Sequence, residues 1–167
     1  NIGVIYKSLG KHEDALEIYD RILLLNHSIG DKGIINRTHG NKGVVLKELQ
    51  RYEEALKEFE LQIKISEYSE DKIGTGIGKR GLGNVYKKMN KFDMAIDCFN
   101  DALKIFTDMG DRREEGIALA NIGETLIESG SSDNSQDFLE RSLKIFKEIG
   151  DKNLKKIVLG DLEKIKN

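Results

Sequence analysis

The chain contains 167 residues, of which 38% are hydrophobic and 34% charged, and it has neither Pro nor Trp. Lys and Arg total 27 and Asp and Glu total 29, so a net charge of −2 argues against a nucleic-acid-binding protein. No apolar run approaches the roughly 18 residues that a membrane span requires. The only cysteine, Cys98, cannot form an internal disulfide, so we expect a reducing, cytoplasmic location.

The sequence repeats itself at one fixed offset, the distance from Gly3 to Gly43, without insertion or deletion. Three kinds of position recur: glycine at Gly3, Gly43, Gly83 and Gly123, aspartate at Asp31, Asp71, Asp111 and Asp151, and a small residue at Ala15, Ala55, Ala95 and Ser135. A fixed period of about 40 residues is typical of proteins in which each repeat packs on the next. We therefore expect a single array over residues 1–167, and its start within half a helix suggests a piece of a longer array.

Within each period the apolar spacing predicts two helices. The stretch from Phe92 to Phe106 shows this best, because its apolar residues follow one another at steps of three and one. In chain order, the predicted helices cover residues 1–9, 12–29, 31–49, 52–69, 71–89, 92–109, 111–129, 132–149 and 151–166. Aspartates such as Asp31 and Asp111 are expected to cap the helices that follow them. The fourth repeat departs from the pattern at Ser131, Ser132, Ser135 and Gln136. We expect its second helix to pack less tightly.

The third repeat shows the full pattern of apolar residue, glycine, aromatic, turn, aromatic, alanine and aromatic, at Leu82, Gly83, Tyr86, Phe92, Ala95 and Phe99. This pattern resembles the tetratricopeptide repeat. The length of the period and its Gly-Asp junctions resemble the variety found in kinesin light chains, Pins-type adaptors and prokaryotic sensor proteins. The resemblance implies an all-α fold, a right-handed α-solenoid of antiparallel helix pairs. It also implies a scaffold or adaptor that binds a protein or peptide and is not an enzyme.

In such a solenoid the first helix of each pair lines the concave groove. The resemblance therefore implies a peptide-binding groove that includes Arg37, Asn41, Val44, Lys47, Ile77, Arg80, Asn84, Lys87, Lys88, Asn121, Glu124 and Glu128. Asparagine recurs at one groove position, in Asn1, Asn41 and Asn121, with Gly81 breaking the row. An amide both donates and accepts, so such a row can bind the main chain of an extended peptide. The alternative is that these amides only bond a neighbouring helix.

Charge differs between the two kinds of helix. Residues 31–49 carry a net charge of +2 and residues 71–89 of +4, whereas 12–29, 52–69, 92–109 and 111–129 each carry −3. We interpret the basic inner helices as steering an acidic segment, with basic residues of that segment near Glu124 and Glu128. A simple solvated surface is the alternative interpretation.

Two other binding hypotheses are open. Arg80, Asn84 and Asn121 match three groups of the chaperone-type clamp for a C-terminal carboxylate, but that clamp needs cations at Ile157 and Asp161. The chain could also be a regulatory or sensor domain of a larger signalling protein or enzyme, whose output domain lies outside this sequence. Self-association through exposed ends is a further expectation.

No catalytic, metal or cofactor site is predicted. Gly76, Gly78 and Gly81 match a dinucleotide-binding motif, but the motif needs a strand before it and here falls within a helix. The three histidines lack metal-ligand spacing.

Overall fold

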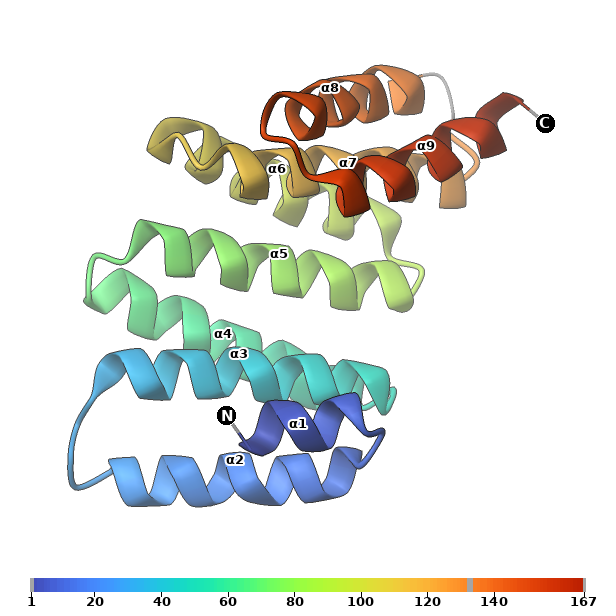
Figure 1. Cartoon of the computed structure of the whole chain (residues 1–167). Coiled ribbons are helices and arrows are strands. Elements are labelled where there is room, and N and C mark those ends of the chain that lie inside the picture. Colours follow the sequence, from blue (N-terminus) through green and yellow to red (C-terminus); the bar gives the residue numbers. More distant parts are fainter. Residues whose placement is uncertain (1, 132–133, 167) are drawn as a thin grey trace. The chain divides into compact units, whose positions relative to one another are not determined.

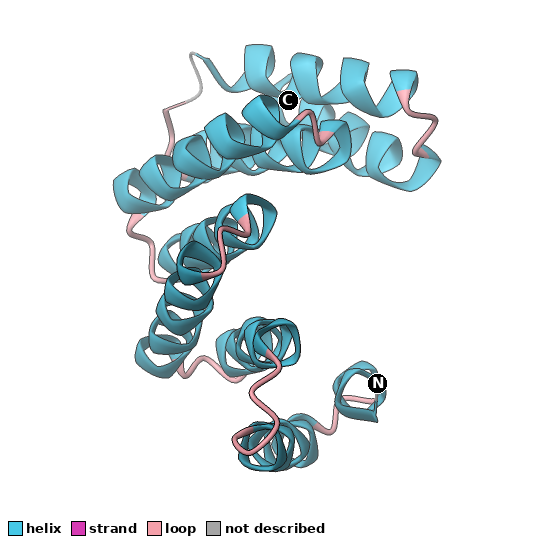
Figure 2. Ribbon diagram, turned by 90° about the vertical axis from the view of Figure 1, so that its left-hand side faces the viewer, coloured by secondary structure: helices cyan, strands magenta, loops and turns pink. Residues whose placement is uncertain are grey.

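A computed structural model describes residues 2–131 and 134–166, and this part of the chain forms helices and no strand (Figures 1 and 2). The helices are α1 (Ile2–Ser8), α2 (His12–Asn26), α3 (Lys32–Glu48), α4 (Tyr52–Tyr68), α5 (Lys72–Lys88), α6 (Phe92–Met109), α7 (Arg112–Glu128), α8 (Ser135–Glu148) and α9 (Lys152–Lys166). The predicted all-α helical-repeat fold is confirmed. Predicted and observed helix ends differ by at most three residues, and the predicted starts at residues 1 and 132 lie outside the described residues.

The chain divides into two compact units, Asn1–Val85 and Tyr86–Asn167. In the first unit, α1 packs on α2, α2 on α3 and α3 on α4. In the second unit, α6 packs on α7, α7 on α8 and α8 on α9. Each of these helices therefore packs chiefly on its neighbours in sequence, as expected for a repeat protein whose helices are joined by short loops.

Local sequence signals set the helix ends. The aspartate side chain at each Gly-Asp or Glu-Asp junction accepts a hydrogen bond from the backbone N–H three residues later, at Asp31, Asp71, Asp111 and Asp151. This confirms the predicted caps. The preceding residue adopts a left-handed conformation in each case, which glycine adopts without strain. Glu70 is the non-glycine residue in this group, with a φ of 56°.

Glycines on the first helix of a pair make room for large side chains on its neighbours. A Cβ atom at Gly43 would lie 2.9 Å from the Phe59 ring, and one at Gly81 would lie 2.4 Å from it. The ring of Phe59 on α4 thus packs closely against both α3 and α5. Gly123 makes the same kind of room for Leu139 in the second unit, at 2.7 Å. The contacts of Gly43 and Gly123 explain why glycine recurs at their position of the repeat, whereas Gly81 stands at the position of Asn41.

The expectation that the second helix of repeat four packs loosely is wrong. Helix α8 buries Ser135, Leu139, Ser142, Leu143, Ile145 and Phe146. The polar replacements are confined to its start, and the helix itself begins only at Ser135. Farther along, α7 and α9 both pack against α8, and the hydroxyl of Ser142 donates a hydrogen bond to the carbonyl oxygen of Gly116 at 2.8 Å.

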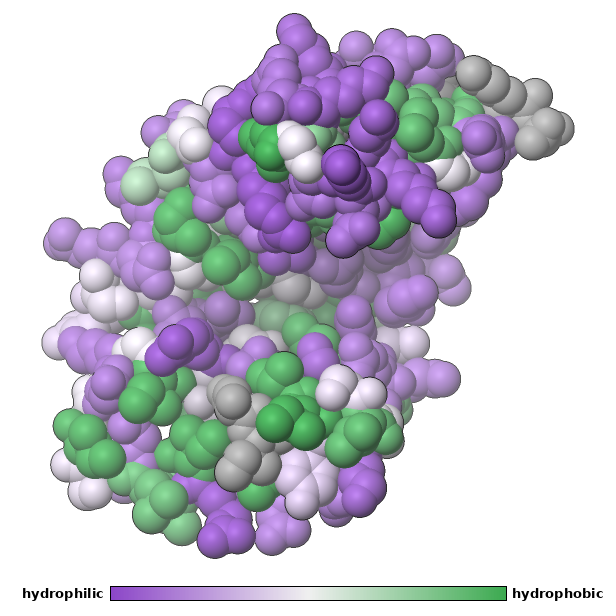
Figure 3. Space-filling view, in the orientation of Figure 1, coloured by the Kyte–Doolittle hydropathy of each residue, from purple (hydrophilic) through white to green (hydrophobic). Residues whose placement is uncertain are grey.

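Apolar side chains are exposed on α1, at the end of α2 and in the loops that follow these helices, where Figure 3 shows a concentration of hydrophobic residues low in the view. They are Val4, Ile5, Leu9, Leu24, Leu25 and Ile29. Ile5 is 55% exposed, whereas Val45 and Val85, at the same position of the next two repeats, are fully buried. The open edge of α1 therefore has the apolar character of a packed repeat face.

Candidate functional site

Seven of the twelve predicted groove residues line one cleft in the first unit. The cleft has a volume of about 250 Å³ and is formed by α3, α4 and α5. The predicted residues that line it are Arg37, Asn41, Val44, Lys47, Ile77, Arg80 and Asn84. The remaining lining residues are Gly40, Phe59, Gln62 and Gly81.

Helical spacing places the side chains of the cleft together. On α3, Arg37, Asn41 and Val44 follow one another at steps of four and three, so they share one face of the helix. The cleft residues of α5 follow the same rule. Among the described residues that line the cleft, three carry a positive charge and none carries a carboxylate. The charged side chains that line the cleft are therefore all basic.

Helix α4 contributes the side chains that sequence reasoning missed. Phe59 is 3% exposed and Gln62 is 5% exposed, yet both line the cleft. A Cβ atom at Gly40 would lie 2.8 Å from the Oε1 atom of Gln62. The glycine thus leaves room for the amide of Gln62 beside the cleft. A signal was available: position 62 is Gln where the other repeats have Ile22, Ala102 and Ser142.

The other five predicted groove residues, Lys87, Lys88, Asn121, Glu124 and Glu128, belong to the second unit. The Nζ atom of Lys87 lies 2.8 Å from Oε2 of Glu124 and 3.6 Å from Oε1 of Glu128, and the residue is only 8% exposed. The expectation that Lys87 faces an acidic ligand therefore needs correction. Its ammonium group neutralises the same two carboxylates that were assigned to basic ligand residues, because Lys87 lies beside Glu124 and Glu128 of α7.

The asparagine row is only partly observed. Asn1 lies outside the described residues, Asn41 lines the cleft, and Asn121 is half-buried. The Nδ2 atom of Asn121 has no hydrogen-bond partner among the described residues, so this donor does not bond a neighbouring helix.

The two positions that a carboxylate clamp needs as cations do not serve that role. Ile157 is exposed, and Asp161 is buried with its carboxylate 2.6 Å from the Nζ atom of Lys164. A buried carboxylate at this position would repel the carboxylate of a ligand.

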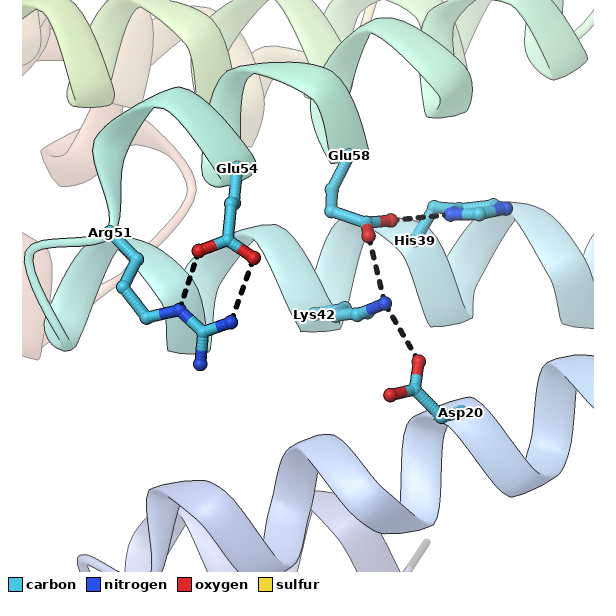
Figure 4. A network of polar contacts seen from close by, with 6 residues as sticks. All are labelled: Asp20, His39, Lys42, Arg51, Glu54 and Glu58. Atoms are coloured by element: carbon cyan, nitrogen blue, oxygen red, sulfur yellow. Dashed lines mark hydrogen bonds and ion pairs between the residues drawn. The ribbon is translucent and has the colours of Figure 1, made fainter.

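Figure 4 shows a polar network that links α2, α3 and α4. The Glu58 carboxylate lies 2.6 Å from Nδ1 of His39 and 2.9 Å from Nζ of Lys42, which also lies 2.7 Å from Asp20. Burial alone would raise the pKa of Glu58, but the contacts with His39 and Lys42 outweigh it and lower that pKa below its ordinary value. Burial likewise opposes the charge of Lys42, yet the hydrogen bonds to Asp20 and Glu58 raise its pKa.

Comparison with known families decides the classification. Tetratricopeptide repeat profiles match residues 34–108 and residues 1–32. The chain is a tetratricopeptide repeat (TPR) protein. Among curated proteins, none matches the sequence.

Solved structures show the same fold as this TPR chain. BtubC (BKLC) from P. vanneervenii is 16% identical with a TM-score of 0.74, and the match covers 98% of this chain and 76% of that one. The apo form of RapI is 17% identical with a TM-score of 0.80, covering 96% of this chain and 45% of RapI. A third structure is of a Podosopora anserina protein described as a putative kinesin light chain with nearly identical TPR-like repeats. It is 10% identical with a TM-score of 0.76, and the match covers 96% of this chain and 80% of that one. At these identities the likeness concerns the fold.

Three further observations on the described residues of the TPR chain bear on which other kinds of site it contains. No helix among them is long and apolar enough to cross a membrane. Within residues 2–131 and 134–166, no three His, Cys, Asp or Glu side chains are grouped as a metal ion would require. Cys98 is a partly buried thiol. The cleft between α3, α4 and α5 is thus the feature on which a functional proposal can be built.

Proposed function

We propose that this TPR protein-interaction module binds an extended, acidic segment of a partner protein in the cleft between α3, α4 and α5. The observation that carries the proposal is that three cations, two asparagines and three apolar side chains line the same cleft, with no carboxylate among its described lining residues. The cations attract the acidic side chains of the segment and speed its association. Of the five predicted groove residues of the second unit, all but Lys87 stay a prediction.

The charges alone do not account for useful affinity. Micromolar binding corresponds to about −8 kcal/mol, whereas each exposed ion pair contributes ~0–1 kcal/mol. The amides of Asn41 and Asn84 can both donate to and accept from a peptide main chain. Val44 and Ile77, both half-buried, offer apolar contact area beside them. Main-chain hydrogen bonds and apolar burial therefore supply most of the binding energy in this proposal, while the three cations set the charge preference.

The proposal can be tested without knowing the natural partner. Peptides are selected from a random dodecapeptide library on the immobilised chain, and the binding kinetics of the selected peptides are then measured. We expect acidic sequences to be enriched. Reversal of two cleft charges, Arg37→Glu with Arg80→Glu, should weaken binding by about tenfold or more, mainly through slower and more salt-sensitive association.

A matched control reverses two exposed lysines on α4, Lys57→Glu with Lys64→Glu, which change the net charge equally outside the cleft. This control should alter affinity by less than about twofold. Asn41→Ala with Asn84→Ala should instead speed dissociation, because main-chain hydrogen bonds are lost. Equal binding by the cleft reversal and the control would contradict the proposal.

The regulatory alternative uses the same cleft. In a sensor domain of a larger protein, the cleft would receive a signalling peptide or an internal segment of that protein. Sequencing the complete gene distinguishes the two roles, because a sensor requires an attached output domain.

A further inference from the structure

Gln62 combines three properties that together point to a ligand. The residue is 5% exposed, it lines the cleft, and its Oε1 atom has no hydrogen-bond partner among the described residues. Buried side-chain acceptors in folded proteins are almost always hydrogen-bonded, because an unpaired one loses its hydration without compensation. An acceptor left unpaired beside a cleft is therefore suited to a donor that arrives with a ligand.

Gly40 has no side chain, and this leaves room for the Oε1 atom of Gln62. A side chain at Gly40 would place its Cβ atom 2.8 Å from Oε1 of Gln62, closer than such atoms pack. The arrangement is peculiar to this repeat. The residue equivalent to Gln62 is Ala102 in the third repeat and Ser142 in the fourth, and the hydroxyl of Ser142 already bonds a carbonyl oxygen.

The surroundings limit the chemistry of the donor. Arg37, Lys47 and Arg80 line the same cleft, so an ammonium or guanidinium group on the ligand would be repelled. A neutral donor fits better. An extended peptide presents backbone N–H groups at regular intervals along its length, and these groups carry no charge.

We propose that Oε1 of Gln62 accepts a hydrogen bond from a backbone N–H of the bound segment, at an acidic residue whose carboxylate faces the cleft cations. This inference rests on the proposed function, because it requires that an acidic segment occupies the cleft. It adds a residue on α4 to a binding surface otherwise built from α3 and α5. It also specifies that Gln62 binds the main chain of the segment and not one of its side chains.

The test uses an acidic peptide selected on the wild-type chain and a series of its analogues, each with one backbone nitrogen methylated. N-methylation removes one N–H donor at a time. We expect one acidic position at which methylation weakens binding to the wild-type chain by about tenfold, the effect of leaving a buried acceptor unpaired. In Gln62→Leu, methylation at that position should cost less than about twofold, because no acceptor remains to be left unpaired.

Gly40→Ala provides a second variant, because its added methyl group must displace the amide of Gln62. It should also abolish the sensitivity to methylation, and circular-dichroism melts verify that both variants are folded. If the methylation penalties in Gln62→Leu equal those in the wild type at every position, a side-chain or water contact satisfies Gln62 and the inference is wrong. In that case binding that still depends on Arg37 and Arg80 leaves the proposed function standing. If no acidic peptide is selected, or the charge reversal has no effect, both are overturned.

Discussion

Replacing Glu58 with Gln should destabilise the first unit, because Glu58 is the carboxylate shared by His39 and Lys42. The side chains of Glu58 and His39 are each 13% exposed and that of Lys42 is 19% exposed, so solvent screens these contacts weakly. Glutamine keeps one acceptor oxygen and turns the other into a donor, so one hydrogen bond to a charged acceptor is lost. Such a bond contributes roughly 1.5–3 kcal/mol. Because Lys42 retains Asp20, we expect a loss of about 2 kcal/mol, within the same range.

The assay is urea unfolding of the whole chain, followed by far-ultraviolet circular dichroism. With an m-value of roughly 2 kcal/mol per molar urea, a loss of about 2 kcal/mol lowers the midpoint by about 1 M. The matched control is Glu54→Gln on the same helix. Glu54 makes two hydrogen bonds of 2.7 Å to Arg51, but both side chains are well exposed (Figure 4). Its removal should barely change the midpoint.

The pH dependence provides a second check on Glu58. Because the folded state lowers the pKa of this carboxyl group, its contribution is fully present above the ordinary pKa and is lost as the pH falls through the lowered value. The difference between wild type and Glu58→Gln should therefore be complete at neutral pH and disappear in strong acid. Equal midpoint shifts for Glu58→Gln and Glu54→Gln at neutral pH would refute the reasoning.

Three further predictions concern packing. Ala95→Glu places a charge at a fully buried position and should cost more than about 3 kcal/mol, so an unchanged thermal melt would show that the helix register is wrong. Gly81→Ala should destabilise the chain by about 1–3 kcal/mol, because its Cβ atom would overlap the Phe59 ring. Gly160→Ala has no atom within 4 Å of its Cβ and should gain up to ~1 kcal/mol of helix stability. The urea midpoints of the two variants test this difference. If the chain associates through the open edge of α1, Ile5→Glu should reduce the average mass in light scattering at high concentration, and a wild-type chain that is monomeric at every concentration would count against it.

The repeat itself made most of the fold predictable. Once the period is found, each capping aspartate and each buried alanine falls at a known place in a helix, and the structure confirms these positions. The face of a helix is likewise fixed by its period of about 3.6 residues. This is why Arg37, Asn41 and Arg80, which the resemblance and the repeat register together assign to the groove, line one cleft.

The sequence does not show which side chains of different helices contact one another. The spacing places Lys87 on an inner face but does not show that Glu124 approaches it to 2.8 Å. Gln62 lies on the second helix of its pair, which the resemblance assigns to the other side of the array. Its place in the cleft depends on the absence of a side chain at Gly40, which the helical period does not reveal. The only signal in the sequence is that the equivalent residues of the other repeats are Ile22, Ala102 and Ser142.

The pairing of each helix with its neighbours in sequence also governs how fast and in what order the chain folds. Within each unit, contacts between helices join segments that follow one another, so little loop-closure entropy opposes them and rapid folding is expected. The free energy of local unfolding should therefore differ from helix to helix. Helix α1 spans seven residues and packs on α2. Its amides should exchange with solvent hydrogen well before those of α3, which α2 and α4 cover from two sides. A protease should accordingly cleave this chain within α1 before it cleaves within α3.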